Sequence, residues 1–200
     1  FAFVNLQYIK MNVKEILTMP DSYRQIKALP EDPVGTVAYG FSTPYSQSFI
    51  TAFPFPPESA MLFGDAQRVI NGIHHSLGNN QALIEVNTGE TTSGRPYIYS
   101  IIKTAQEPSG VQYFILFQEK IGNEVVCVKA FFQEYGTTRI RDNEIFSAML
   151  SQGILTMEEK GKWWRDPYDE TLKRSFLMNL SELEQFDEYF PDHRFHKRGH

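Results

Sequence analysis

A succession of four strand-like runs, followed by one helical run, constrains the fold of this chain more than any other feature. The four runs span residues 82–86, 96–104, 111–121 and 124–135, and they are rich in aromatic and β-branched residues. Short turn-forming segments separate them, and the last, Gly122-Asn123, is typical of a two-residue hairpin. Because parallel neighbours need long crossover connections, these short turns predict a mostly antiparallel sheet.

The third run of this block, residues 111–121, is apolar on both of its faces. Side chains alternate between the two faces of a strand, so the pattern can be followed residue by residue. The apolar residues are Val111, Tyr113, Ile115 and Phe117 on one face, and Phe114 and Leu116 on the other. A strand of this kind is buried on both sides, which predicts helices over both faces of the sheet.

A hairpin and two helices are predicted around the block. Residues 34–41 and 48–55 are aromatic and β-branched runs joined by a loop longer than two residues, which predicts the hairpin. Asp65 is expected to cap a helix that ends near Leu77, because apolar residues recur there at helical spacing. Asp142 is expected to cap a second helix that ends before a glycine.

The first thirty residues predict short helical elements. Asn12 and Glu15 have capping-box spacing for a helix that Pro20 ends. Asp21 is expected to begin a second helical turn that reaches Leu29. These elements would lie ahead of the hairpin.

A single domain with an extension accounts for the whole chain. The fold class expected from these elements is α+β: an α/β/α sandwich with a central, mostly antiparallel sheet of about six strands. We expect residues 1–153 to form this domain. Residues 154–200 are expected to form a helical C-terminal extension packed on the domain, with a mobile basic tail.

Composition limits the classes of protein to which the chain can belong. It has 200 residues and a formal net charge of -5. Nucleic acid is not an expected partner, because its binding rests on clustered Lys and Arg that neutralise phosphates. Cys127 is the single cysteine, which excludes an intramolecular disulfide and favours a reducing compartment, the cytoplasm. No apolar run reaches about 18 residues, so no membrane span is expected.

The junction between the last strand-like run and the last helix carries the phrase Glu134-Tyr135-Gly136-Thr137-Thr138-Arg139-Ile140-Arg141-Asp142. With the preceding order of hairpin, helix and three-stranded meander, it resembles the PsbP-like superfamily over about residues 34–153. That superfamily includes Ran-binding nuclear-transport factors of the Mog type, photosystem accessory proteins and many bacterial proteins. The resemblance implies an α/β/α sandwich, a bacterial member, and a binding or assembly role without chemistry of its own.

No catalytic, metal or cofactor site is predicted. His74 and His75 are adjacent on a helix and point about 100 degrees apart, unlike the i, i+4 pairs that bind metals. Residues 89–96 superficially resemble a phosphate-binding loop, but they join strand to strand and lack its Lys. Cys127 alternates with valines in a strand, which indicates a packed thiol. The chain is therefore not expected to be an enzyme, although scattered carboxylates leave that class open.

Two sets of residues are candidates for binding. Four residues in the extension are predicted to contact a protein partner, since Trp, Tyr and Arg dominate interface energetics. They are Trp163, Trp164, Arg165 and Tyr168. Arg139, Arg141 and Asp142 form a second cluster at a helix start, where backbone N–H groups favour anions. Its expected role is structural, with the aspartate as cap and the arginines bound to neighbouring carbonyls or carboxylates.

These patterns predict a non-catalytic soluble domain that binds a protein partner or serves as an accessory factor. The alternative is a small-ligand-binding protein or an enzyme with a pocket between the sheet and the C-terminal extension. A third class is a structural domain that self-associates, for which a symmetric apolar patch would be the sign.

Overall fold

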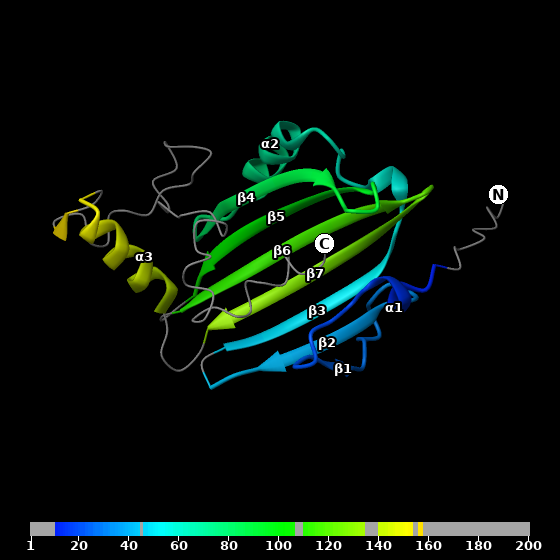
Figure 1. Cartoon of the computed structure of the whole chain (residues 1–200), viewed down its shortest axis with the longest axis horizontal. Coiled ribbons are helices and arrows are strands. Elements are labelled where there is room, and N and C mark those ends of the chain that lie inside the picture. The colour runs from blue at the N-terminus through cyan, green and yellow to red at the C-terminus, as the bar shows by residue number, and fades with distance from the viewer. Residues whose placement is uncertain (1–10, 45, 107–109, 135–139, 154–155, 158–200) are drawn as a thin grey trace.

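Seven antiparallel strands form one sheet at the centre of the structure (Figure 1). The structure, a computed structural model, describes residues 11–44, 46–106, 110–134, 140–153 and 156–157. The strands lie across the sheet in the order β1-β2-β3-β7-β6-β5-β4. In chain order the described elements are α1 (Val13–Ile16), β1 (Arg24–Ile26), β2 (Val37–Ser42), β3 (Ser46–Phe55), the 3-10 helix η1 (Pro57–Ser59), α2 (Ala66–Ser76), β4 (Gln81–Glu90), β5 (Pro96–Ala105), β6 (Val111–Ile121), β7 (Glu124–Glu134) and α3 (Ile140–Ser151).

The sheet consists of two meanders that meet where β3 pairs with β7. Strands β1 to β3 form the first meander and strands β4 to β7 the second, and within each every strand pairs with the next one in sequence. The join between them is a ten-residue antiparallel pairing that runs from Ser46↔Glu134 to Phe55↔Val125. One long-range pairing therefore unites the two halves of the sheet.

The block of four strands predicted from the sequence is confirmed as β4 to β7. Gly122 opens the last turn with φ +63°, in the left-handed region that glycine tolerates. β4 is longer than expected and continues to Glu90. Its last residues include Gly89, which pairs with Tyr97. A Cβ at position 89 would lie 2.8 Å from the Tyr97 hydroxyl oxygen, so a larger residue here would require the Tyr97 side chain to shift.

The sheet has one strand more than expected, and the additional strand is β1. The prediction of a helical turn from Asp21 to Leu29 is wrong, because Arg24 to Ile26 pair antiparallel with β2. Without β1, the backbone groups along that side of β2 would have no partner in the sheet. This tertiary requirement outweighs the local helix signal.

The two faces of the sheet have different covers. We call the face on which Val13 of α1 packs the α1 face, and it carries the main core. The core includes Val13, Tyr39, Ile50, Ile84, Ile101, Tyr113, Ile115, Val128 and Phe132. The opposite face, the α2 face, carries a smaller apolar cluster in which Ile70 of α2 packs with Leu83 and Val86 of β4.

α2 begins at the predicted cap and covers the β4 end of its face. The Asp65 side chain accepts a hydrogen bond from the Arg68 backbone N–H at 3.0 Å, which satisfies one of the free donors of the first turn. Apolar residues at helical spacing then face the sheet. Those packed around Ile70 are Ala66, Val69, Ile73 and Leu77, together with Ile102 of β5.

The described helices do not form the two complete layers of the expected α/β/α sandwich. α1 is a single turn, and α3 lies beyond one end of the sheet in Figure 1, although its Phe146 is buried in the main core. α3 begins at Ile140, so the prediction that Asp142 caps this helix is wrong and Asp142 lies in its first turn. An antiparallel sheet with few helices is the confirmed part of the fold class. The predicted extension, residues 154–200, lies outside the described residues except for residues 156–157.

Candidate functional site

One row of side chains on the α2 face changes from buried to exposed as it crosses the sheet. Paired residues of neighbouring antiparallel strands share a face, so the register defines the row. From β4 to β1 it consists of Leu83, Ile102, Phe114, Phe131, Phe49, Gly40 and Arg24. Leu83 is 0% exposed, whereas Phe131 is 40% and Phe49 is 47% exposed. The apolar row therefore continues well past the helix that covers its beginning.

The exposed part of this row is the main candidate for a binding surface. We call Phe49, Phe114 and Phe131 of this row, together with Ile26 of the neighbouring row, the open aromatic surface. The rings of Phe114 and Phe131 contact each other, with centroids 4.8 Å apart and planes at 40°. Ile26 is 41% exposed. Large apolar groups gathered in this way mark interaction sites more often than single exposed residues do.

Amide side chains border the open aromatic surface along one side. The Gln47 side-chain amide donates to the Gln133 side-chain oxygen at 2.9 Å, and Gln133 donates to the Gln106 side-chain oxygen at 3.3 Å. Ser42 lies opposite Gln47 in the same row. This border is polar and uncharged, and its hydrogen bonds hold the amides in place.

The opposite border is formed by the segment that follows β3. The Met61 backbone N–H donates to the Gln118 side-chain oxygen at 2.7 Å, and Gln118 is buried. Phe53 and Cys127 lie in the same row as Gln118 and are also buried. Burial raises the pKa of the Cys127 thiol to about 11, and the nearby Lys129 opposes that rise. The α2 face of β7 thus passes from covered at Cys127 to open at Phe131.

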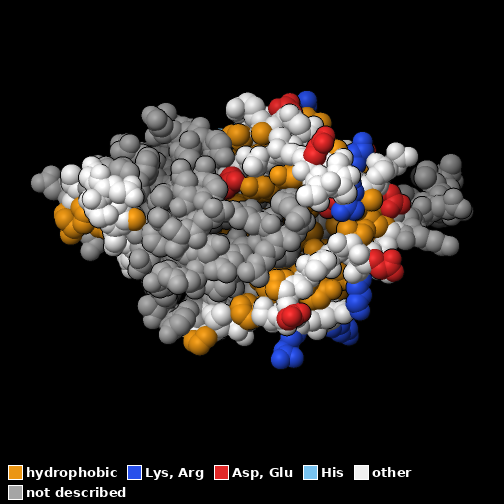
Figure 2. Space-filling view, in the orientation of Figure 1, with side chains coloured by type: hydrophobic (Ala, Val, Ile, Leu, Met, Phe, Trp, Pro, Cys, Tyr) orange, Lys and Arg blue, Asp and Glu red, His pale blue; other side chains and the backbone are white. Residues whose placement is uncertain are grey.

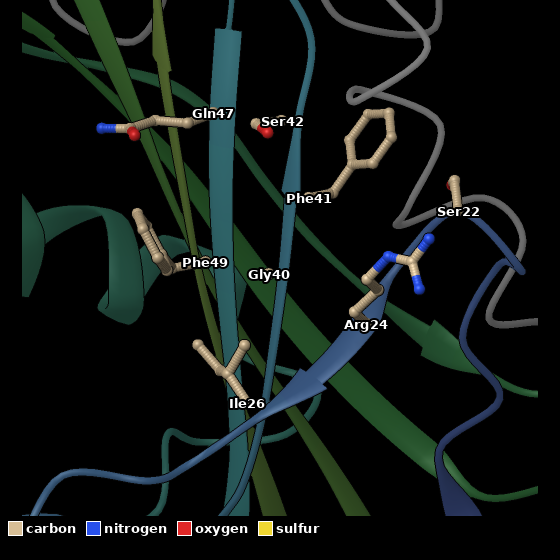
Figure 3. Close-up of a pocket in the computed structure, with 8 residues that line it drawn as sticks. All are labelled: Ser22, Arg24, Ile26, Gly40, Phe41, Ser42, Gln47 and Phe49. Carbon is tan, nitrogen blue, oxygen red and sulfur yellow. The ribbon is translucent and has the colours of Figure 1, made fainter.

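A hollow of about 450 Å³ lies at the β1 end of the open aromatic surface. It is lined by Ser22, Arg24, Ile26, Gly40, Phe41, Ser42, Gln47 and Phe49 (Figure 3). Figure 3 shows Ile26 and Phe49 on the same side of the strands, and the Arg24 guanidinium directed toward Ser22. Gly40 lies between β1 and β3 without a side chain, and the nearest atom to a Cβ placed there is Ile26 Cγ2 at 3.6 Å. The absence of a side chain at this position adds to the space of the hollow.

The charged residues that strands β1, β2, β3, β6 and β7 place on the α2 face are basic. The register assigns Arg24, Lys120 and Lys129 to it, and it assigns no Asp or Glu of β1, β2, β3, β6 or β7 to the same face. The Lys129 ammonium lies 5.3 Å from the centroid of the Phe53 ring. Figure 2 shows Lys and Arg side chains along the lower edge of the molecule, where Figure 1 shows β1, with Asp and Glu side chains close to them. The positive electrostatic potential of these basic side chains favours an acidic partner.

The α1 face holds a separate buried polar group near β4 and β5. The Tyr99 hydroxyl donates to Glu85 Oε1 at 2.5 Å, and burial together with this bond raises the pKa of Tyr99 above its usual range. The other oxygen of Glu85 has no hydrogen-bond partner among the described residues, and Glu85 is 8% exposed. Nearby, Arg95 Nε forms an ion pair with Glu119 Oε1 at 2.6 Å, while burial raises the pKa of Glu119 against the effect of Arg95.

Comparison with known proteins identifies no family. No family model matches the sequence, and no curated protein matches it. Among solved structures, the chain is similar to cyanobacterial PsbP (CyanoP) from Synechocystis sp. PCC 6803, with 10% identity and a TM-score of 0.39. The similarity covers 67% of this chain and 81% of that one. At this level it carries no argument about function, and membership of the PsbP-like superfamily stays a prediction.

The binding residues predicted from the sequence lie largely outside the described part of the structure. Trp163, Trp164, Arg165, Tyr168 and Arg139 are all outside the described residues. Arg141 and Asp142 belong to the first turn of α3, but their side chains are not among those described. Both sets of predictions therefore stay predictions. Among the described helices, none is long and apolar enough to cross a membrane.

The open aromatic surface was not predicted from the sequence, although its strands were. Phe49 and Phe131 look like ordinary core residues in strands that alternate apolar side chains. The signal that was available is the third predicted strand, whose second face carries Phe114 and Leu116 and was expected to be covered. Few helices of the described residues are available to provide that cover, and α2 extends over only part of the face.

Proposed function

We propose that this protein is a non-catalytic accessory protein that binds a partner protein through the open aromatic surface. The observation that carries the proposal is the exposure of Phe49 and Phe131, which continue an apolar row whose other end is fully buried. Burying a large apolar side chain is worth about 1.5–3 kcal/mol, and much of that gain is still available at these two positions. A partner that covers Phe49 and Phe131 would gain this free energy on binding.

The setting of the surface also suits protein recognition. Aromatic residues are enriched at the centres of protein interfaces, and a polar rim commonly surrounds them. Here the amides of Gln47 and Gln133 border the aromatic rings, and the basic side chain of Arg24 lies at one end. The described residues therefore provide an apolar centre, a polar border and a charge for orientation.

Capture by the immobilised intact chain tests this proposal. The test variant is Phe49→Gln/Phe131→Gln, and the matched control is Leu29→Gln/Val34→Gln, which changes two exposed apolar residues that are not part of the open aromatic surface. Proteins retained from a lysate of the source organism are quantified by mass spectrometry. We expect a near-stoichiometric partner that the control retains and the test variant loses.

A partner retained equally by both variants would contradict the proposal. A third arm, Trp163→Ala/Trp164→Ala, separates the open aromatic surface from the residues predicted in the extension. If only this arm loses the partner, the contact lies in the extension and the open aromatic surface is not the binding site. Circular dichroism of each variant checks that the fold is retained.

A second candidate function rests on Glu85. A buried carboxyl oxygen without a described partner is costly, and a ligand that donates a hydrogen bond would satisfy it. This observation favours the alternative of a small-ligand-binding protein. A screen of amine and hydroxyl compounds by thermal shift, repeated with Glu85→Gln, tests it. Stabilisation that disappears in the variant is expected, and a compound that stabilises both forms equally contradicts it.

A further inference from the structure

The open aromatic surface is a trough with definite borders. The hydrogen-bonded amides of Gln47 and Gln133 close one side, and the segment bonded to Gln118 closes the other. α2 packs on β4 at one end, while the end at β1 is open. An occupant must therefore cross the strands, from β1 toward α2.

We propose that the occupant is an amphipathic α-helix of the partner whose apolar stripe is flanked by acidic residues. This inference rests on the proposed function and adds the form and charge of the segment that binds. The helix lies across β1, β2, β3, β7 and β6, with its apolar side chains on Phe49, Phe131 and Phe114.

The dimensions of the trough fit one helix. From β1 to β6 the open half spans four strand spacings, or roughly 19 Å. At 1.5 Å per residue this length corresponds to roughly 13 helical residues. Between its borders the trough contains two rows, those of Phe49 and Thr51, which lie one side-chain repeat apart on β3. Measured along the strands, two rows occupy roughly 7–14 Å. This width matches the diameter of about 10 Å for a helix with its side chains.

The same face already packs against a helix at its β4 end. Ile70 of α2 packs on Leu83 and Val86, and these residues belong to the two rows that continue into the trough. Leu83 shares the row of Phe49, and Val86 shares the row of Thr51. The partner helix would extend the layer that α2 begins.

The basic side chains of the trough decide the charge expected of the helix. Arg24 lies in the row of Phe49 and Lys129 in the row of Thr51, while Lys120 lies beyond the Gln118 border, and no Asp or Glu of the five strands lies on this face. Arg24 is exposed and forms no ion pair with another described residue. Acidic residues beside the apolar stripe would complement them.

An added strand at the edge of β1 is less well supported. β1 has three residues, and an edge strand this short offers few backbone groups for pairing. A strand at that edge would also leave Phe131 and Phe114 uncovered, because they lie on β7 and β6. The helix covers the residues whose exposure needs an explanation.

Three synthetic peptides of about 14 residues test the inference by titration calorimetry with the intact chain. The first has a leucine stripe flanked by Glu, the second replaces each Glu by Lys, and the third keeps Glu but carries two central prolines. We expect the Glu peptide to bind at least about tenfold more tightly than the Lys peptide. The proline peptide should bind at least about tenfold more weakly than the Glu peptide, because it cannot form the helix.

Variants of the chain place the contact. Phe49→Gln/Phe131→Gln should weaken the Glu peptide at least about tenfold, as expected for central aromatic residues. Arg24→Glu should weaken it about fivefold and strengthen the Lys peptide. The matched control is Lys14→Glu, a charge reversal at an exposed residue of α1 on the other face, which should change neither affinity.

The outcomes separate this inference from the proposed function. Equal binding of the Glu and Lys peptides overturns the acidic partner, and equal binding of the proline peptide overturns the helix. If no peptide binds, yet partner capture still depends on Phe49 and Phe131, the inference fails and the proposed function stands. If no peptide binds and capture is independent of these residues, both fail.

Discussion

The α2 face of the sheet consists of two halves that share their side-chain rows and differ in their cover. On β4 and β5 the rows present aliphatic residues such as Leu83 and Val86, which α2 buries. On β3 and β7 the same rows present Phe49 and Phe131, which are about half exposed. An apolar row does not by itself define a core. The helix laid over it decides which part stabilises the monomer and which part stays available for a partner.

The residue types differ in line with this division. Aliphatic side chains pack densely beneath a helix. Aromatic rings present a large contact area and have only two side-chain torsions to restrict on binding, and they are enriched where partners dock. Phe114 marks the boundary, because it contacts the exposed Phe131 on one side and pairs with Ile102, which packs in the α2 cluster, on the other.

The largest expected effect on stability is in the covered half. Leu83→Ala removes a fully buried side chain beneath α2 and should lower the free energy of unfolding by about 2–5 kcal/mol. Urea unfolding followed by circular dichroism measures it. A loss well under about 1 kcal/mol would show that packing beneath α2 contributes little to stability. The two halves of the face would then not differ in this respect.

The second expected effect concerns Cys127, at the covered end of β7. Because burial raises its pKa from 9.0 to about 11, the thiolate fraction at pH 8 should be roughly 100-fold lower than in the unfolded chain. Reaction with a disulfide reagent at pH 8, with and without denaturant, measures this. The stabilising contribution of the thiol is present below about pH 9 and lost as the pH rises through 11. Rapid labelling of the native protein would show that the Cys127 thiol is accessible, and it would contradict the covered position of this residue.

A moderate effect is expected from the cap of the covering helix. Asp65→Ala removes the hydrogen bond to the Arg68 backbone N–H and should cost about 1 kcal/mol of stability. The loosened α2 should also increase the binding of a hydrophobic dye, because it uncovers more of the row. Asp65→Asn, which keeps an oxygen acceptor, is the control and should retain most of the stability. Equal losses in both variants would show that the capping bond is not the cause.

The smallest expected effect is in the open half. Phe49→Ala should lower the free energy of unfolding by no more than about 1 kcal/mol, since the ring is about half exposed in the monomer. The same urea titration used for Leu83→Ala gives the comparison directly. A cost approaching that of Leu83→Ala would mean that Phe49 serves the fold, and the two halves would no longer differ in role.

Local patterns were sufficient for most of the elements and insufficient for the surface. The meander of β4 to β7 and the cap at Asp65 follow from turn residues and spacing, which act within a few positions. β1 was missed because its pairing with β2 depends on tertiary structure, and a segment of three residues is too short to show a strand pattern. The predictions that lie in residues 158–200 stay untested, since that segment is outside the described residues.

The candidate site escaped sequence reasoning for a related reason. Phe49 and Phe131 become neighbours only through the pairing of β3 with β7, and no local signal indicates which strands of two meanders will meet. The extent of α2 was predictable from its periodicity, but the number of strands beneath it was not. Exposure of the aromatic row depends on both facts together.

From the pairing of β3 with β7 we also expect a particular order of events during folding. Gln47 and Gln133, which bond across this join, stand 86 positions apart, so closing the sheet is a slow, late step compared with forming either meander. Neither meander alone carries the complete trough. A chain still emerging from the ribosome, or one arrested before the join closes, would have no site to offer, and partner binding would act as a check that the sheet is complete.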